Sequence, residues 1–164
     1  MIEILSTGLS NSVQDLGRFG HLDAGVSRSG AMDGQALDIA NRLLGNDPAA
    51  AGLEITIFPF RLRFLKACRF AIAGADAECM LGTQRLPNFW TCRATEGDEL
   101  RIAPPQAGAR VYLAFEGGID VPPVLGSRST DLKSGWGGLK GRGLERGDRL
   151  PLTEPGSHPP ALPK

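Results

Sequence analysis

The sequence predicts a mainly β fold, a small closed or nearly closed β-barrel, with one principal α-helix. Glycine and proline are abundant, at 22 and 12 of 164 residues, and such frequent turn formers favour short strands over long helices. Short apolar or alternating runs recur between these turns, as in small barrels and sandwiches. A single segment has the spacing of an amphipathic helix.

The expected strands are short and are bounded by turn-forming residues. They cover residues 2–5, 52–57, 61–64, 69–73, 77–81, 85–92, 99–102, 110–115 and 149–152. Pro87 interrupts one of them, because proline cannot donate to a sheet ladder. The pairs Gly97-Asp98 and Gly147-Asp148 each precede a strand, so the same turn-and-strand unit is expected twice.

The principal helix is expected to start after Asp33 and to end at Gly45. The Asp33 carboxylate can accept hydrogen bonds from amides of the first turn, and Gly45-Asn46 supplies a left-handed stop. Pro48 prevents continuation. One apolar stripe at helical spacing consists of Ala36, Leu37, Ile39, Ala40, Leu43 and Leu44.

Composition argues against several functional classes. Lysine plus arginine and aspartate plus glutamate each number 18, so the basic surplus of a nucleic-acid or anionic-membrane binder is missing. No run approaches the length of a membrane span, and the start lacks a signal-peptide pattern. We therefore expect neither nucleic acid nor a membrane as partner, and a cytoplasmic location.

The cysteines do not indicate a metal site. Cys68, Cys79 and Cys92 are odd in number, and their spacing matches no zinc motif. They are interpreted as small buried side chains in strands. The domain itself is expected to span residues 1–152, followed at 153–164 by a proline-rich tail or linker.

A polar loop at residues 9–30 contains the first group of candidate site residues. Gln14, Asp15 and Arg18 lie there among glycines. A guanidinium can clamp a carboxylate or phosphate through two hydrogen bonds. The alternative is structural, with Asp15 and Arg18 paired to each other or capping nearby backbone groups.

A second glycine-rich stretch, at residues 116–131, contains further candidates. Ser127 and Ser129 flank Arg128, which places hydroxyl donors beside a cation as in an oxyanion or carboxylate site. Gly117 and Gly118 allow close backbone approach to a ligand. The alternative is an ordered loop that crosses the barrel mouth. The Gly-Lys-Ser/Thr ending of a P-loop is missing.

A third stretch, at residues 135–144, is glycine-dense and basic. Its composition favours a flexible surface lobe.

The motifs of these three loops, taken in their order along the chain, resemble those of the allophanate hydrolase subunit 2 family. This family is also described as the 5-oxoprolinase C subunit, biotin-dependent carboxyltransferase or Kip anti-inhibitor. Members of this family continue into a second barrel-like half, so the likeness concerns the N-terminal half. The segments that resemble the family are Gln14-Asp15-Leu16-Gly17-Arg18, Ser29-Gly30-Ala31-Met32-Asp33, Leu53-Glu54, Gly117-Gly118-Ile119, Gly126-Ser127-Arg128-Ser129-Thr130 and Gly147-Asp148.

The resemblance implies a cyclophilin-like β-barrel that works in a complex. The leading hypothesis is a component of an ATP-dependent 5-oxoprolinase complex, equivalent to its C subunit; the complex opens 5-oxoproline to glutamate. Its partners would be the Kip-inhibitor-like B subunit of the complex and also the A subunit, and ATP would act at the level of the complex. One alternative is a biotin-dependent carboxyltransferase component of a urea carboxylase/allophanate hydrolase system, using carboxybiotin on a separate carrier. Another is a non-catalytic regulatory module that binds a Kip-inhibitor-like partner.

The substrate would be a small amide, lactam or urea. Arg18 and Arg128 are predicted to bind its anionic oxygen, and Asp15 either to orient Arg18 or to transfer a proton. Asp15, Arg18 and Arg128 are thus the predicted catalytic residues. The predicted substrate-binding residues are Gln14, Gly117, Gly118, Ser127 and Ser129. If the active site lies between the two halves, the isolated chain is expected to be inactive.

Overall fold

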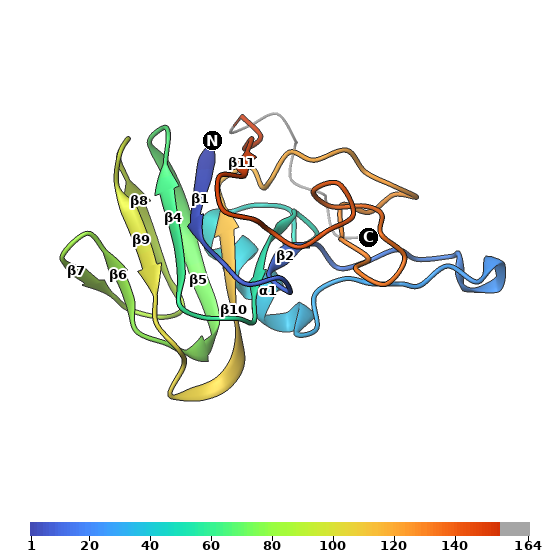
Figure 1. Cartoon of the computed structure of the whole chain (residues 1–164), viewed down its shortest axis with the longest axis horizontal. Helices are drawn as coiled ribbons and strands as arrows, with labels where there is room; N and C mark the ends of the chain where they lie inside the picture. The colour runs from blue at the N-terminus through green and yellow to red at the C-terminus, as the bar shows by residue number, and fades with distance from the viewer. Residues whose placement is uncertain (155–164) are drawn as a thin grey trace.

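The computed structural model describes residues 1–154 and consists of two antiparallel sheets with one α-helix (Figure 1). The predicted tail falls outside the described residues from position 155 onward. The elements are β1 Ile2–Ser6, β2 Ser12–Gln14, the 3-10 turn η1 Leu22–Ala24, α1 Gly34–Leu44, β3 Gly52–Ile55, β4 Phe60–Phe64, β5 Cys68–Asp76, β6 Cys79–Leu81, β7 Gln84–Leu86, β8 Trp90–Ala94, β9 Glu99–Ile102, β10 Ala107–Phe115 and β11 Arg149–Leu150.

The strands form a six-stranded sheet in the order β11-β1-β4-β9-β6-β7 and a five-stranded sheet in the order β2-β3-β10-β5-β8. The mainly β class with one α-helix is thus confirmed. A barrel is not confirmed, because no strand pair joins the two sheets into a closed ladder within residues 1–154. The long loops at residues 116–148 gather at one end of the sheets, where the N-terminal loop also lies (Figure 1).

The main core lies between the sheets, because alternate side chains of each strand point to the shared face. Leu62 of one sheet and Leu113 of the other are both fully buried in it, and the rings of Phe64 and Phe70 are 5.0 Å apart. The opposite face of the five-stranded sheet carries small side chains such as Ala71 against α1. Helix α1 therefore covers the outer face of the five-stranded sheet, and the main core is enclosed between the two sheets.

Helix α1 follows the predicted capping pattern. The Asp33 carboxylate accepts a hydrogen bond of 3.0 Å from the Ala36 amide. Gly45 ends the helix with a φ of 74°, which glycine adopts without strain. Leu37 and Ala40 of the apolar stripe are fully buried. Both predicted boundaries of the helix are confirmed.

The repeated Gly-Asp turn is also confirmed. Gly97 N–H donates to Phe64 O, and Gly147 N–H donates to Ile4 O, each at a distance of 2.8 Å. Both glycines have a φ of 90°. Each turn thus returns the chain to a neighbouring strand in the same way, and leads into β9 and β11 respectively.

Two expectations about loops were wrong. Residues 12–14 were placed in a loop but form β2, whose Val13 pairs with Leu53 of β3. Residues 135–144 are not a flexible lobe: Gly137 and Gly143 are buried, and a Cβ on Gly143 would collide with Leu9 O. Glycine is required there because the backbone packs closely against neighbouring segments.

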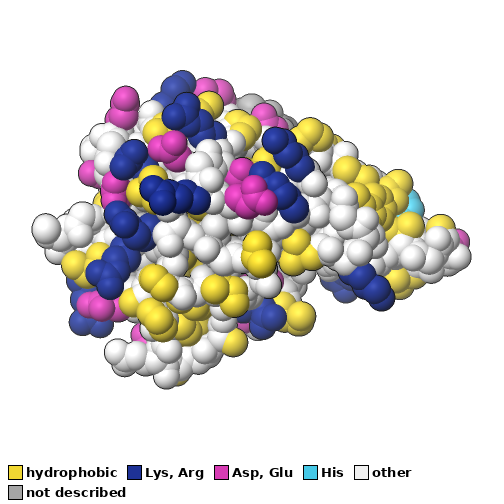
Figure 2. Space-filling model, in the orientation of Figure 1, with side chains coloured by type: hydrophobic (Ala, Val, Ile, Leu, Met, Phe, Trp, Pro, Cys, Tyr) yellow, Lys and Arg dark blue, Asp and Glu magenta, His cyan; other side chains and the backbone are white. Residues whose placement is uncertain are grey.

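The surface differs between the strands and the projecting loop at residues 19–26. Charged side chains of both signs are interspersed over the upper part of the strands, and hydrophobic side chains gather where the long loops lie, beside the base of the projecting loop (Figure 2). Phe19 and Leu22 are 62% and 73% exposed there. Within the described part of the chain, no helix has the length and apolar character needed to cross a bilayer.

Candidate functional site

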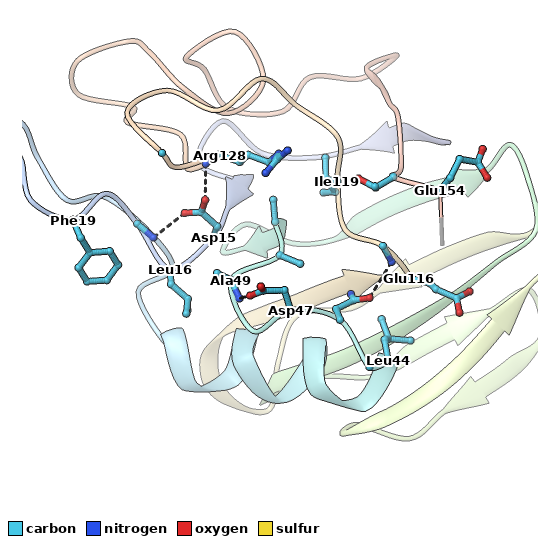
Figure 3. Close-up of a pocket in the computed structure, with 18 residues that line it drawn as sticks. Asp15, Leu16, Phe19, Leu44, Asp47, Ala49, Glu116, Ile119, Arg128 and Glu154 are labelled. Carbon is cyan, nitrogen blue, oxygen red and sulfur yellow. Dashed lines mark hydrogen bonds between the residues drawn. The ribbon is translucent and has the colours of Figure 1, made fainter. Parts of the chain in front are cut away.

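The Asp15 carboxylate connects two loops that are distant in the sequence. Asp15 directly follows β2, and its two oxygens accept hydrogen bonds from four donors. Oδ1 accepts from Gly17 N–H at 2.7 Å and from the Ser127 and Ser129 hydroxyls at 2.7 and 2.5 Å. Oδ2 accepts from Arg128 N–H at 2.5 Å. Asp15 therefore fixes the loop at residues 127–129 against the end of β2 (Figure 3).

Backbone contacts strengthen the same connection. Asp15 N–H donates to Ser129 Oγ at 3.0 Å, and Thr130 N–H donates to Val13 O at 3.0 Å. Hydrogen bonds to a charged group contribute about 1.5–3 kcal/mol each. A buried carboxylate that already accepts this many bonds is suited to hold loops in place. Removing a substrate proton would require it to give up part of this network.

Arg18 supports the second loop from within the protein. The residue is 2% exposed, its Nε donates to Val124 O at 3.1 Å, and its Nη2 donates to Ser129 O at 2.5 Å. Its guanidinium carbon lies 4.8 Å from the centre of the Trp136 ring, a distance at which a cation is attracted to the ring face. No ion pair joins Arg18 to Asp15 among residues 1–154, so Arg18 caps backbone carbonyls instead.

Arg128 lies at the edge of a cavity of about 560 Å³. Its backbone is fixed by Asp15, and its Nε donates to Val121 O at 2.9 Å. It takes part in none of the ion pairs found among the described residues. Asp47, Glu116 and Glu154 line other parts of the same cavity (Figure 3).

The remaining wall of this first cavity is partly apolar, with Leu44 at the end of α1 and Ile119 after β10. Glu116 also forms an ion pair with Arg69 at 3.3 Å. The cavity thus combines a cation, carboxylates and apolar surface. Such a mixture suits a small molecule that has both an anionic group and a hydrogen-bond donor.

The structure brings only some of the predicted site residues to this cavity. Asp15, Gly117 and Arg128 line it. Ser127 and Ser129 are buried and donate to Asp15. The other predicted residues are Arg18, which is buried as described, Gln14, which lines a second cavity, and Gly118, which lines neither.

The two glycine amides predicted to meet the substrate already donate within the protein. Gly117 N–H donates to Asn46 Oδ1 at 2.9 Å, and Gly118 N–H donates to Phe115 O at 2.8 Å. Asn46 Nδ2 in turn donates to Phe115 O at 2.8 Å. From the sequence, Asn46 was predicted to belong to the helix stop, and no contact with Gly117 was expected. The signal available was its position as a polar amide directly after the C-cap glycine, where it can also bond a neighbouring turn.

The cysteines are free, and burial raises the pKa of Cys79 to about 12 and that of Cys68 to about 11. Among residues 1–154, no group of three or more His, Cys, Asp or Glu side chains is placed to hold a metal ion.

The fold is that of a carboxyltransferase-type domain. The family "carboxyltransferase domain, subdomain A and B" matches residues 24–163, and the chain belongs to it. The family resemblance noted in the sequence is confirmed.

Among individual proteins, the chain is similar to the C subunit of 5-oxoprolinase from Escherichia coli, with 47% identity over 152 residues, 93% of this chain and 49% of that protein. The corresponding protein of Haemophilus influenzae is 38% identical, over 92% of this chain and 48% of that protein. The chain therefore spans about half the length of these relatives.

Urea amidolyases are similar as well. That of Saccharomyces cerevisiae is 38% identical over 99% of this chain and 9% of its own length. The crystal structure of the Kluyveromyces lactis urea amidolyase matches 99% of this chain and 10% of that chain, with a TM-score of 0.89 and 38% identity.

Proposed function

We propose that this chain is a component of an ATP-dependent 5-oxoprolinase complex in the cytoplasm, equivalent to its C subunit, and that the first cavity binds 5-oxoproline. The observation that carries the proposal is Arg128, a cation outside any described ion pair, fixed at the cavity edge by Asp15. The 47% identity with the Escherichia coli protein supports it.

The chemistry of 5-oxoproline matches this cavity. Its carboxylate would bind the Arg128 guanidinium, which prefers planar oxyanions. Its lactam N–H would face carboxylates such as Asp47 and Glu116, and its ring carbons would contact Leu44 and Ile119. Asp15 acts as a positioning residue for Arg128 in this proposal.

ATP and the remainder of the catalytic site would come from the rest of the complex. The chain spans about half the length of its 5-oxoprolinase relatives. The activity would therefore belong to an assembly that includes an equivalent of the other half of those relatives, the Kip-inhibitor-like B subunit and the A subunit. The projecting loop with exposed Phe19 and Leu22 supports a contact with such a partner.

The decisive experiment measures 5-oxoproline-dependent ATP hydrolysis by the assembled complex. Arg128→Ala should abolish the 5-oxoproline dependence, whereas Arg85→Ala, an exposed arginine on β7, should leave it unchanged. Equal activity of the two variants, with both folded by circular dichroism, overturns the proposed site.

A second candidate function is a biotin-dependent carboxyltransferase component. The similarity to the Kluyveromyces lactis urea amidolyase structure favours it. This function requires a biotinylated carrier and bicarbonate. If turnover depends on both, the carboxyltransferase function is favoured over the 5-oxoprolinase function. Stoichiometric binding to a Kip-inhibitor-like protein without turnover would instead indicate the regulatory module.

A further inference from the structure

A second cavity, of about 430 Å³, shares none of its lining residues with the first. Its size falls within the range of small-molecule sites. It lies where β2, β3 and β10 meet the loop at residues 130–132. The lining residues are Ser10, Ser12, Gln14, Ser29, Gly30, Glu54, Thr56, Ile57, Arg110, Thr130, Asp131 and Leu132.

Gln14 provides an acceptor that the protein does not use. Its Nε2 donates to Thr130 O at 3.1 Å and to Ser12 Oγ at 2.9 Å. Because a backbone carbonyl can only accept, these bonds define which end of the amide is oxygen. The residue is 6% exposed, and its Oε1 has no hydrogen-bond partner within residues 1–154. An unsatisfied buried acceptor destabilises the fold unless a ligand or water supplies the missing hydrogen bond.

Asp131 adds a negative charge to the same wall. Its Oδ1 accepts from Lys133 N–H at 3.1 Å and from Ser134 N–H at 3.0 Å. Burial acts to raise the pKa of Asp131, but the hydrogen bonds from Ser134, Lys133 and Trp136 outweigh it and lower the pKa. The carboxylate is therefore ionised at neutral pH.

Glu54 is only partly neutralised. Its Oε2 accepts from Tyr112 Oη at 2.7 Å and from Met32 N–H at 2.8 Å. Its Oε1 lies 3.5 Å from Arg110 Nε, too far for a strong hydrogen bond, and Arg110 Nε has no hydrogen-bond partner among the described residues. The ion pair with Arg110 is thus loose.

The charge of the lining selects the ligand. Glu54 and Asp131 give two negative charges and Arg110 gives one positive charge, and the other lining residues are uncharged, so the sum is −1. A primary ammonium has three donors, no acceptor and a positive charge. We propose that this cavity binds a small molecule through a primary ammonium group, which donates to Gln14 Oε1 and faces the two carboxylates. The proposal does not depend on the function proposed above.

Titration of the ¹⁵N-labelled chain with n-propylammonium chloride, followed by NMR, tests this proposal. Saturable shifts are expected for the Gln14 side-chain amide and for the Met32 and Thr130 backbone amides. Propionamide, a neutral amide of similar size, should bind at least about tenfold more weakly, because it lacks the charge. Equal or tighter binding of propionamide overturns the proposal. So does an absence of shifts with propylammonium, since water then satisfies Gln14.

Variants identify the residues. Gln14→Met removes the acceptor at similar size and should weaken propylammonium binding at least about tenfold, the loss of one charge-assisted hydrogen bond. Gln106→Met, at an exposed glutamine outside both cavities, is the matched control and should change nothing. If Gln14→Met does not fold, Asp131→Asn should give a similar weakening of propylammonium binding.

Unchanged propylammonium affinity in whichever of these two variants folds contradicts the site. Arg128→Ala, a change at the first cavity, should leave propylammonium binding intact.

Discussion

The two cavities differ in how their polar groups are satisfied. Beside the first cavity, Asp15 accepts from four protein donors, so its charge holds loops in place. Beside the second, Gln14 Oε1 accepts from none of the described residues. A buried polar group with all its partners stabilises the fold, whereas one without them favours a ligand or water that supplies the missing bond.

The largest expected effect is that of Asp15→Asn. The substitution keeps the size but removes the charge, and it sets an amide N–H₂ against a group that can only donate, either Gly17 N–H or Arg128 N–H. We expect the free energy of unfolding to fall by about 4 kcal/mol, measured by urea denaturation. Asp131→Asn, the matched change at the second cavity, should cost less than about 1 kcal/mol. Equal losses would remove the distinction between the cavities.

The two arginines beside Asp15 should also differ in their effects on stability. Arg18→Ala leaves Ser129 O without its donor, removes one of the two donors of Val124 O and opens a void beside Trp136, so we expect a loss of about 3 kcal/mol. Arg128→Ala removes one side-chain hydrogen bond and should cost about 1 kcal/mol. Melting curves of both variants test this, and a larger loss for Arg128 would show that their roles are reversed.

A smaller effect is expected for Asn46→Ala. The variant loses the bonds to Gly117 N–H and Phe115 O and should be destabilised by about 2 kcal/mol. Because Gly117 lines the first cavity, amide hydrogen exchange there should accelerate, while exchange at Thr130 beside the second cavity stays the same. Uniform acceleration at both sites would indicate global loosening instead.

The smallest effect concerns the third loop, which packs against Arg18. Arg142 donates to both oxygens of Asp148 at 2.8 Å, and this hydrogen bonding lowers the pKa of Asp148 in the folded protein. A lowered pKa contributes stability above the carboxyl group's ordinary range, and this contribution is lost as the pH falls through the folded pKa. The unaltered chain should be more stable than Asp148→Asn by about 1 kcal/mol at neutral pH, and the gap should close in acid. A gap independent of pH would contradict the ion pair.

Local signals explain which parts of the fold were predictable. The helix boundaries follow from Asp33 and Gly45, and β9 follows from the Gly97-Asp98 turn and the four strand residues after it. Each could therefore be recognised within a short window of sequence. Strand β2 could not, because Ser12 and Gln14 are polar and are buried only by partners far along the chain, such as Thr130.

The sequence indicated candidate site residues but not the contacts they make in the fold. Asp15 and Ser129 were both selected, yet 114 positions separate them, and only the folded chain shows that they bind each other. Glycine density at residues 135–144 was interpreted as flexibility, but a Cβ on Gly137 would collide with Arg18 Nη2. Close packing and flexibility both require glycine, and the sequence does not distinguish them.

The most direct test of the contrast between the cavities is one NMR titration series on the labelled chain, with 5-oxoproline and n-propylammonium added separately and then together. We predict that 5-oxoproline shifts the amides of Gly117 and Gly126 in the first cavity, that propylammonium shifts the Gln14 side-chain amide in the second, and that neither probe displaces the other. Competition between the probes, or shifts of the same residues by both, would contradict two separate sites with different chemistry.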